Sequence, residues 1–124
     1  MKLSVTADVF RLAQVFTISR GSRTEAHVLT VTITDGAYVG RGECVPYARY
    51  GETLESVAAQ IKGLALPLAR DALQNALPAG AARNAVDCAL WDLEAKKTGI
   101  PVWQLAGLKA PLAEVTAYTL SLDT

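Results

Sequence analysis

The sequence is poor in the side chains from which most metal and redox sites are built. Among its 124 residues are one histidine, two cysteines and one methionine, and 6% are aromatic. Metal centres and redox pairs place Cys and His at short, regular spacings, whereas Cys44 and Cys88 lie far apart. A Cys-His metal centre and a Cys-x-x-Cys redox pair are therefore excluded, and we expect both cysteines to be buried thiols.

An excess of charge of one sign is also absent, because 12 basic side chains balance 12 acidic ones. Proteins that bind nucleic acid or anionic membranes neutralise phosphates with clustered Lys and Arg, so this balance argues against both partners. The apolar runs are too short to cross a bilayer. Residues 1–20 alternate apolar with polar positions and carry Asp8 and Arg11, unlike a secretory signal. We therefore expect a cytoplasmic protein.

Apolar surface is abundant, since 51% of the residues are hydrophobic, which at this length supports one domain with its own core. Alternating apolar and polar residues over 3–9 and 27–34 predict two half-buried strands. Asp35-Gly36 follows directly and predicts a hairpin turn with positive φ at both turn positions. A returning strand from Ala37 to Arg41 completes a three-stranded antiparallel meander.

The second half of the sequence has helical patterns. Thr53 is a suitable N-cap for an apolar stripe over 54–65, and a short helix is expected over 70–76. A longer helix is expected from about Ala81 to Lys97, followed by Gly99 as a C-terminal cap. Small residues form a stripe on this helix that lets a neighbouring backbone approach closely: Ala82, Ala85, Val86, Ala89 and Leu93.

The last apolar segment alternates again, so residues Val115–Leu122 predict one more strand. The overall fold class is therefore α+β, a three-stranded antiparallel meander followed by a helical bundle. The final strand is separated from the meander by the helices. It pairs back onto the first sheet or belongs to a further sheet.

Catalytic groups are scarce. His27 lies inside a predicted strand near Glu25, which favours a sheet residue over an acid-base role. Gly40-Arg41-Gly42 looks like a fragment of a phosphate-binding loop, but no helix begins directly after it. An anion would therefore have no helix N-terminus to bind, and we reject that interpretation.

Two polar segments are better candidates for a binding site. Phe16–Glu25, which we expect to be a long loop between the first two strands, carries two arginines, whose planar donor forks suit carboxylates or phosphates. Arg41–Glu52 carries two tyrosines and a further arginine. Both segments leave the same end of the meander, so we expect them to converge. The alternatives are a solvated, flexible connection for the first segment and rings that cover the sheet edge for the second.

Three stretches resemble one known family. They are Arg-Gly-Ser-Arg-Thr-Glu-Ala from Arg20, Gly-Arg-Gly-Glu-Cys-Val-Pro-Tyr-Ala-Arg-Tyr-Gly-Glu from Gly40, and Ala-Ala-Arg-Asn-Ala-Val-Asp-Cys-Ala-Leu-Trp-Asp-Leu-Glu-Ala-Lys from Ala81. They resemble the N-terminal capping domain of the enolase superfamily, within its muconate-lactonizing subgroup. The resemblance is closest to the L-Ala-D/L-Glu dipeptide epimerases. Residues 99–107 are similar to the segment that leads from cap to barrel.

The resemblance implies a division of the chain and of the chemistry. Residues 1–112 form an enolase-like cap, and residues 113–124 form the first strand of a (β/α) barrel that this chain does not contain. In the family a barrel-bound Mg²⁺ stabilises an enediolate while lysines remove and return the α-proton. No Lys-x-Lys pair occurs among Lys2, Lys62, Lys96, Lys97 and Lys109. No catalytic residue and no metal ligand is therefore expected here, and the chain alone should be inactive.

Substrate selection is the role that the resemblance assigns to the cap. Arg20 or Arg23 would pair with the side-chain carboxylate of the Glu residue, and Arg20 is favoured. Thr119 matches a first-barrel-strand residue that touches substrate. The remaining expected substrate-binding residues border the same pocket: Tyr47, Arg49 and Tyr50. Trp91, Asp92 and Trp103 are expected to hold the cap to the barrel.

The function implied is that of the capping and specificity domain of a Mg²⁺-dependent dipeptide epimerase. Its expected partners are a small dipeptide from cell-wall turnover, its own barrel domain and a possible second copy. One alternative is a free-standing α+β module for binding or oligomerisation, which would hide its apolar surface internally. The other is the cap of a related enzyme, such as an acid-sugar dehydratase, an o-succinylbenzoate synthase or a cycloisomerase. The arginines of the first segment argue mildly against this second alternative.

Overall fold

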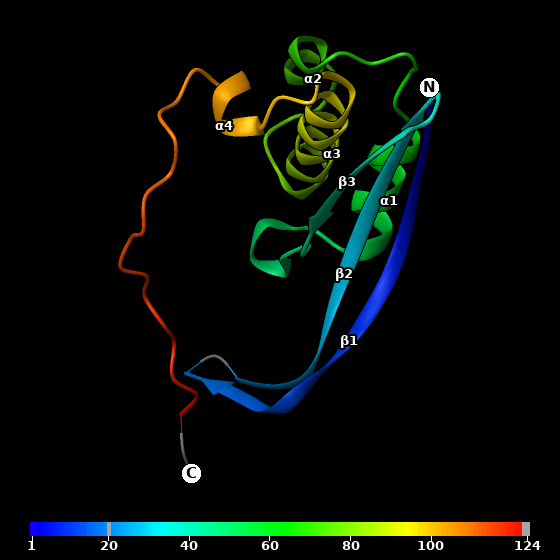
Figure 1. Cartoon of the computed structure of the whole chain (residues 1–124). Coiled ribbons are helices and arrows are strands. Elements are labelled where there is room, and N and C mark those ends of the chain that lie inside the picture. The colour runs from blue at the N-terminus through cyan, green and yellow to red at the C-terminus, as the bar shows by residue number, and fades with distance from the viewer. Residues whose placement is uncertain (20, 123–124) are drawn as a thin grey trace.

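A computed structural model describes residues 1–19 and 21–122. Three strands form one antiparallel sheet in the order β1 (Lys2–Ile18), β2 (Gly21–Asp35) and β3 (Tyr38–Cys44). Figure 1 shows β1 and β2 as a long curved arm that runs well past the short β3. The predicted meander is confirmed, and its first two strands are longer than expected.

Two of the helices pack directly against one face of this sheet, and the other two pack against the longest helix (Figure 1). After a 3₁₀ turn, η1, the chain forms helices α1 to α4, with these bounds: η1 Ala48–Tyr50, α1 Leu54–Lys62, α2 Arg70–Ala76, α3 Ala81–Thr98 and α4 Val102–Leu105. Thr53 caps α1 through reciprocal hydrogen bonds with Ser56, and Gly99 ends α3 with φ of 71°. The predicted helices and both caps are confirmed. None of the described helices has the length and apolarity needed to cross a membrane.

The turn between β2 and β3 lies one residue later than predicted. Asp35 still pairs with Tyr38, so the turn residues are Gly36 and Ala37. Gly36 has φ of 60°, but Ala37 does not share the positive φ that we expected at both positions. Asp35 remains in the strand, with its carboxylate near the Met1 ammonium, at 3.5 Å, and bound to Lys97.

The polar segment Phe16–Glu25 is not a long loop, contrary to the prediction. β1 continues to Ile18 and β2 begins at Gly21, which leaves two residues between them. Between the pairs Arg11–Glu25 and Phe16–Arg23 the register shifts, so four residues of β1 face one residue of β2. The polar side chains are tolerated in a strand here because most of them lie on an exposed arm.

The core is built where α3 lies directly on β3. A methyl group on Gly42 would lie 2.0 Å from the carbonyl oxygen of Ala85, and one on Gly40 would lie 2.1 Å from that of Ala89. The two glycines therefore let a helix backbone touch the strand, as the small-residue stripe predicts. Side chains with no exposed surface surround this contact: Val31, Ile33, Val57, Ile61, Leu73, Ala85, Val86 and Ala89.

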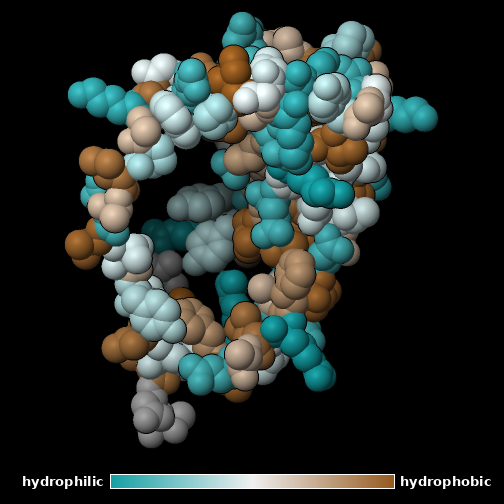
Figure 2. All heavy atoms as spheres, viewed as in Figure 1, coloured by the Kyte–Doolittle hydropathy of each residue, from teal (hydrophilic) through white to brown (hydrophobic). Residues whose placement is uncertain are grey.

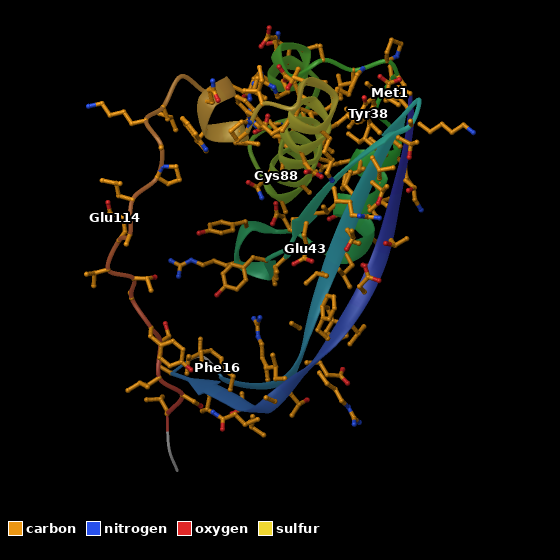
Figure 3. The ribbon with its side chains drawn as sticks, viewed as in Figure 1. Met1, Phe16, Tyr38, Glu43, Cys88 and Glu114 are labelled. Carbon is orange, nitrogen blue, oxygen red and sulfur yellow. The ribbon has the colours of Figure 1, made fainter. Side chains whose placement is uncertain are left out.

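The cysteines differ from each other. Cys44 is buried, and desolvation, together with the nearby Glu52 and Glu43, raises the pKa of its thiol to about 11. Cys88 is exposed on α3, so the expectation of a second buried thiol is wrong. Figure 3 shows Cys88 on the outer part of α3, at the rim of the contact with β3.

The predicted strand Val115–Leu122 is absent from the described part of the chain, where residues 108–122 form neither helix nor strand. A strand needs neighbouring backbone to pair with, and among the described residues the only backbone hydrogen bond from this segment to the sheet is that of the Leu122 amide, which donates to the Thr17 carbonyl at 2.8 Å. Figure 2 shows a hollow between this segment and the body of the molecule, with hydrophobic side chains along the segment.

Asp92 hydrogen-bonds to the backbone of β3, the strand at the edge of the sheet. Its carboxylate accepts hydrogen bonds from the Arg41 amide at 2.8 Å and from Lys96 at 2.7 Å, while Lys96 also donates to the Val39 carbonyl. Burial raises the pKa of Asp92, but the hydrogen bonds from Lys96 and Arg41 outweigh it and leave the pKa lowered. The observed partners of Asp92 thus lie within this domain.

Acid should destabilise the fold through Asp35 and Asp92. The hydrogen bond from Lys97 lowers the pKa of Asp35, as those from Lys96 and Arg41 lower the pKa of Asp92. A lowered carboxyl pKa stabilises the folded state fully above the unfolded value of about 3.9, and this contribution disappears as the pH falls through the folded value. We expect urea unfolding to show a constant free energy above about pH 5 and a decline below about pH 4. Asp92→Asn should shrink that decline, and an unchanged decline in the variant would contradict this account.

Candidate functional site

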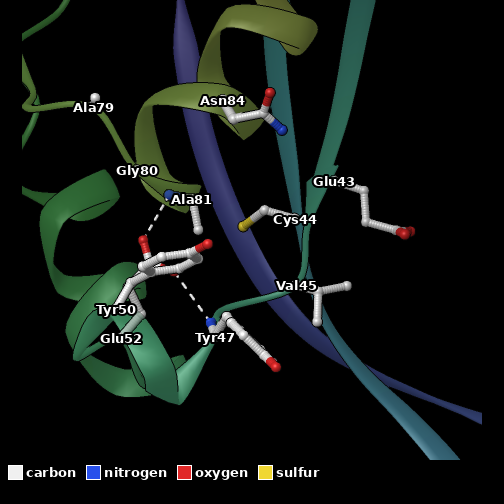
Figure 4. Close-up of a pocket in the computed structure, with 10 residues that line it drawn as sticks. All are labelled: Glu43, Cys44, Val45, Tyr47, Tyr50, Glu52, Ala79, Gly80, Ala81 and Asn84. Atoms are coloured by element: carbon white, nitrogen blue, oxygen red, sulfur yellow. Dashed lines mark hydrogen bonds between the residues drawn. The ribbon is translucent and has the colours of Figure 1, made fainter. Parts of the chain in front are cut away.

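A pocket of about 560 Å³ lies between the end of β3 and the start of α3. Figure 4 shows that Tyr47 and Tyr50 reach it from the connection that follows β3. Their ring centroids are 5.7 Å apart and their planes are inclined by 58°, a tilted aromatic pair. The pocket is lined by Glu43, Cys44, Val45, Tyr47, Tyr50, Glu52, Ala79, Gly80, Ala81 and Asn84.

Glu52 fixes this connection in place, and the sequence reasoning missed it. One carboxylate oxygen accepts from the Tyr47 amide at 3.1 Å, and the other accepts from the Ala81 amide at 2.7 Å (Figure 4). The N-cap of α3 is Gly80, which has no side chain to offer. A helix that begins after Pro-Ala-Gly needs a hydrogen-bond acceptor from elsewhere in the chain. That missing acceptor was the sequence signal that could have pointed to a residue such as Glu52.

A second pocket, of about 410 Å³, lies on the β1–β2 arm. Arg23 lines it from β2 and Phe16, its cross-strand partner, lines it from β1. Tyr118 reaches it from the C-terminal segment, next to Thr119 in the sequence. The other lining residues are Leu12, Ala13, Gln14, Glu25 and Ala26. A guanidinium beside aromatic rings is a suitable environment for a carboxylate ligand.

Ser121 fastens the C-terminal segment to the arm beside this pocket. Its hydroxyl oxygen accepts from the Thr17 amide at 2.9 Å and lies 3.4 Å from the Val15 carbonyl oxygen, to which it donates. Figure 3 shows Phe16 of the arm beside this part of the segment. Residues more than 100 positions apart in the sequence are thereby joined at one end of the molecule.

Replacing Ser121 by alanine should release the Thr17 amide. That amide loses its acceptor, so its hydrogen exchange should accelerate by about tenfold, the equivalent of a bond worth about 1.4 kcal/mol. Exchange at Val31, in the core part of β2, should not change. Backbone NMR of the variant measures both amides. Equal exchange of Thr17 in the two proteins would show that the contact is not maintained in solution.

The predicted substrate residues fall into two groups. Arg23 lines the arm pocket and Thr119 follows its Tyr118, whereas Tyr47 and Tyr50 line the pocket at α3. The structure thus places the two segments in separate pockets, contrary to the convergence that we expected, because β2 runs on to Gly21 beyond its last pair with β3, at Leu29. Arg49 is exposed on η1 between the tyrosines, and Arg20 lies outside the described residues.

Acid-base and metal chemistry find little support in these pockets. His27 lies in β2 with Nε2 3.6 Å from a carboxylate oxygen of Glu25, as expected for a sheet residue. Over residues 1–19 and 21–122, no three His, Cys, Asp or Glu side chains gather into a group that would hold a metal ion. The described site is suited to binding and orienting a small polar ligand.

Comparison with known proteins shows the family to which this chain belongs. The family model for the N-terminal domain of mandelate racemase / muconate lactonizing enzyme matches residues 1–107, so the chain belongs to this family, as the resemblance implied. A meander followed by helices is the capping domain of that family within the enolase superfamily.

The relatives that this chain resembles include dipeptide epimerases. L-Ala-D/L-Glu epimerase of Escherichia coli is 44% identical over 126 residues, which cover 98% of this chain and 39% of the relative. N-acetyl-D-glutamate racemase of Pseudoalteromonas is 43% identical over 78% of this chain and 32% of the relative. A crystal structure from Agrobacterium tumefaciens, an enolase family member with homology to dipeptide epimerases and with bound sodium and L-Ala-L-Glu, is 54% identical with a TM-score of 0.88 over 98% of this chain and 38% of its own. The chain thus spans about two fifths or less of these relatives.

Proposed function

We propose that this chain selects the substrate of a dipeptide epimerase of the L-Ala-D/L-Glu type, while a barrel domain performs the chemistry. The observation that carries the proposal is the arm pocket, which is lined by Arg23 from β2 and by Tyr118, the residue before Thr119, from the C-terminal segment. A side-chain carboxylate of a glutamate-containing dipeptide is a fitting ligand for an arginine there. The Agrobacterium relative, with its bound L-Ala-L-Glu, supports the same substrate class.

The reaction proposed for the whole enzyme is removal and return of the α-proton at the Glu residue. Structures of dipeptide epimerases from Methylococcus capsulatus and Enterococcus faecalis contain Mg and a dipeptide. The described residues of this chain do not fit such an ion, since they form no cluster of acidic or imidazole ligands. Metal ligands and lysine bases are therefore assigned to the barrel, and this chain supplies binding, orientation and exclusion of water.

Exposed apolar side chains support a covering role. Leu112, Val115 and Tyr118 are 82%, 102% and 85% exposed, and Leu120 is 77% exposed. Several large apolar side chains exposed along one segment are typical of a surface that another domain covers. We assign residues 1–112 to the cap and residues 113–124 to the first barrel strand, which would gain its pairing partners from the rest of a barrel.

The test joins this chain to a barrel. In a chimera, residues 1–124 replace the matching segment of the E. coli epimerase, giving a cap–barrel protein. We expect this protein to epimerise L-Ala-L-Glu with Mg²⁺, and the 124-residue chain alone to show no turnover. Turnover by the chain alone, abolished by alanine at Arg20 or Arg23, would overturn the division of roles. A folded but inactive chimera would overturn the proposed substrate class.

A further inference from the structure

We propose that Glu52 is a positioning residue that sets the Tyr47–Tyr50 pair, which lines the pocket at α3, against that helix. Its effect on substrate acts through these two tyrosines, which the family resemblance assigns to substrate binding. The inference rests on the proposed function for its effect on substrate. Its structural part stands on the two hydrogen bonds of one carboxylate, which accepts from the Tyr47 amide at 3.1 Å and from the Ala81 amide at 2.7 Å.

The connection from Tyr47 to Glu52 is a closed unit. The Tyr50 amide donates to the Tyr47 carbonyl at 2.9 Å and the Gly51 amide donates to the Ala48 carbonyl at 3.0 Å, so η1 is a tight turn. Gly51 then reverses the chain with φ of 72°. Glu52 returns its side chain to Tyr47, where the unit began, and closes it. The backbone that carries the two tyrosines is therefore held in one closed turn.

The second oxygen of Glu52 attaches this unit to the longest helix. α3 begins without a side-chain cap of its own, so its first amides need an acceptor, and a carboxylate at a helix N-terminus is favoured by the helix dipole. The same helix lies on β3 through Gly40 and Gly42 and, among the described residues, carries more of the buried core than any other element. Glu52 therefore fixes the position of the turn that carries the two tyrosines relative to the core.

Both contacts require a carboxylate. Tyr47 and Ala81 each present an N–H, so the side chain must accept at two oxygens. Glutamine has one accepting oxygen and an amino group that donates, so it satisfies one amide and opposes the other. Aspartate keeps the charge but is one methylene shorter. Glu52→Gln and Glu52→Asp thus break the same bridge in different ways.

A third variant leaves Glu52 unchanged. A methyl group on Gly80 would lie 2.9 Å from a carboxylate oxygen of Glu52 and would push that oxygen from its position above Ala81. The backbone of Gly80 is extended, with φ of 160° and ψ of −175°, so alanine is not strained there. Gly80→Ala should therefore reproduce part of the effect of Glu52→Gln.

The matched control is Glu43→Gln. Glu43 lines the same pocket, and within the described residues its side chain has no hydrogen bond. This variant removes one negative charge from the pocket without freeing a backbone amide. An effect of charge alone would appear in Glu52→Gln and in Glu43→Gln. An effect of position would appear only in the variants at Glu52 and Gly80.

The first measurement is amide hydrogen exchange on the 124-residue chain. In Glu52→Gln we expect amide exchange at Tyr47 or Ala81 to accelerate by about tenfold or more. Exchange of the core amides of β2 and α3 should not change. In Glu43→Gln we expect no change of exchange at Tyr47 or Ala81. Unchanged exchange at both amides in Glu52→Gln would overturn the proposal, whether or not the chain proves to be an epimerase cap.

The second measurement is the kinetics of the cap–barrel protein. We expect Glu52→Gln and Glu52→Asp to raise KM for L-Ala-L-Glu by about tenfold with kcat changed less than about twofold, and to alter the preference between L-Ala-L-Glu and an apolar dipeptide. A purely structural role would lower the amount of active protein equally for both dipeptides. Faster exchange with unchanged KM and preference would overturn the positioning role. Loss of all activity in the parent chimera would count against the proposed function alone.

Discussion

Gly42→Ala should lower the free energy of unfolding by about 3 kcal/mol, the upper end of what an added methyl costs in a packed core. The new methyl would lie 2.0 Å from the Ala85 carbonyl oxygen and 2.8 Å from the Ala89 amide nitrogen. Both are backbone atoms of α3, so no side chain can turn away to make room. The helix has to move off β3, and the buried contacts on both sides of it are lost.

Gly63→Ala is the matched control for this change. Gly63 ends α1 in helical conformation with φ of −77°, and a methyl group there would lie 3.4 Å from the nearest atom, an ordinary contact. Alanine at that position should be neutral or stabilising by about 0.5 kcal/mol through the unfolded state. Urea unfolding followed by circular dichroism compares the two variants. Equal stability of both would mean that α3 is not held against β3 in the way described.

The helices were the most predictable part of this fold because their signals are local. Thr53 with Ser56 three residues later, and Gly99 after Lys96 and Lys97, mark where α1 begins and where α3 ends. The small-residue stripe on α3 predicted a close backbone approach, although the sequence did not show that Gly40 and Gly42 are the partners. Those glycines were considered only as a phosphate loop, which they are not.

The arm was mispredicted because strand length depends on non-local pairing. Arg23 and its polar neighbours are typical of a loop when they are read alone. Their backbone nevertheless finds a partner in Phe16–Ile18, and that pairing extends both strands. The opposite error occurred at Val115–Leu122, where a pattern typical of a strand lacks a neighbour to pair with among the described residues.

The candidate site was also predicted only in part. Tyr47 and Tyr50 stood out as aromatic residues in a polar connection, and the structure places both at one pocket. Glu52 and Ser121 did not stand out, since each accepts a hydrogen bond from a backbone amide that is distant in the sequence. Single acidic and hydroxyl residues carry no signature of such contacts, and their roles become evident only from the geometry.

Removing the arginine that pairs with the substrate carboxylate should lower kcat/KM of the cap–barrel protein for L-Ala-L-Glu by about 100-fold. A charge-assisted bidentate hydrogen bond contributes about 3 kcal/mol, and each 1.4 kcal/mol is about a factor of ten. Arg20 is the favoured residue on the family resemblance, and Arg23 is the one that lines the arm pocket. Alanine variants of both are therefore compared.

The dipeptide L-Ala-L-Gln identifies which arginine pairs with the carboxylate, because its side chain has nearly the same shape without the charge. The alanine variant of the pairing arginine should lose activity on L-Ala-L-Glu but keep most of its activity on L-Ala-L-Gln. That variant should therefore no longer distinguish the two dipeptides. Lysine at that position should restore only part of the loss, since it keeps the charge but not the planar fork. Arg41→Ala is the control, because Arg41 is exposed on β3 and lines neither the arm pocket nor the pocket at α3. If both alanine variants kept the preference for L-Ala-L-Glu, the arm would not recognise the carboxylate, and the specificity would have to lie in the barrel.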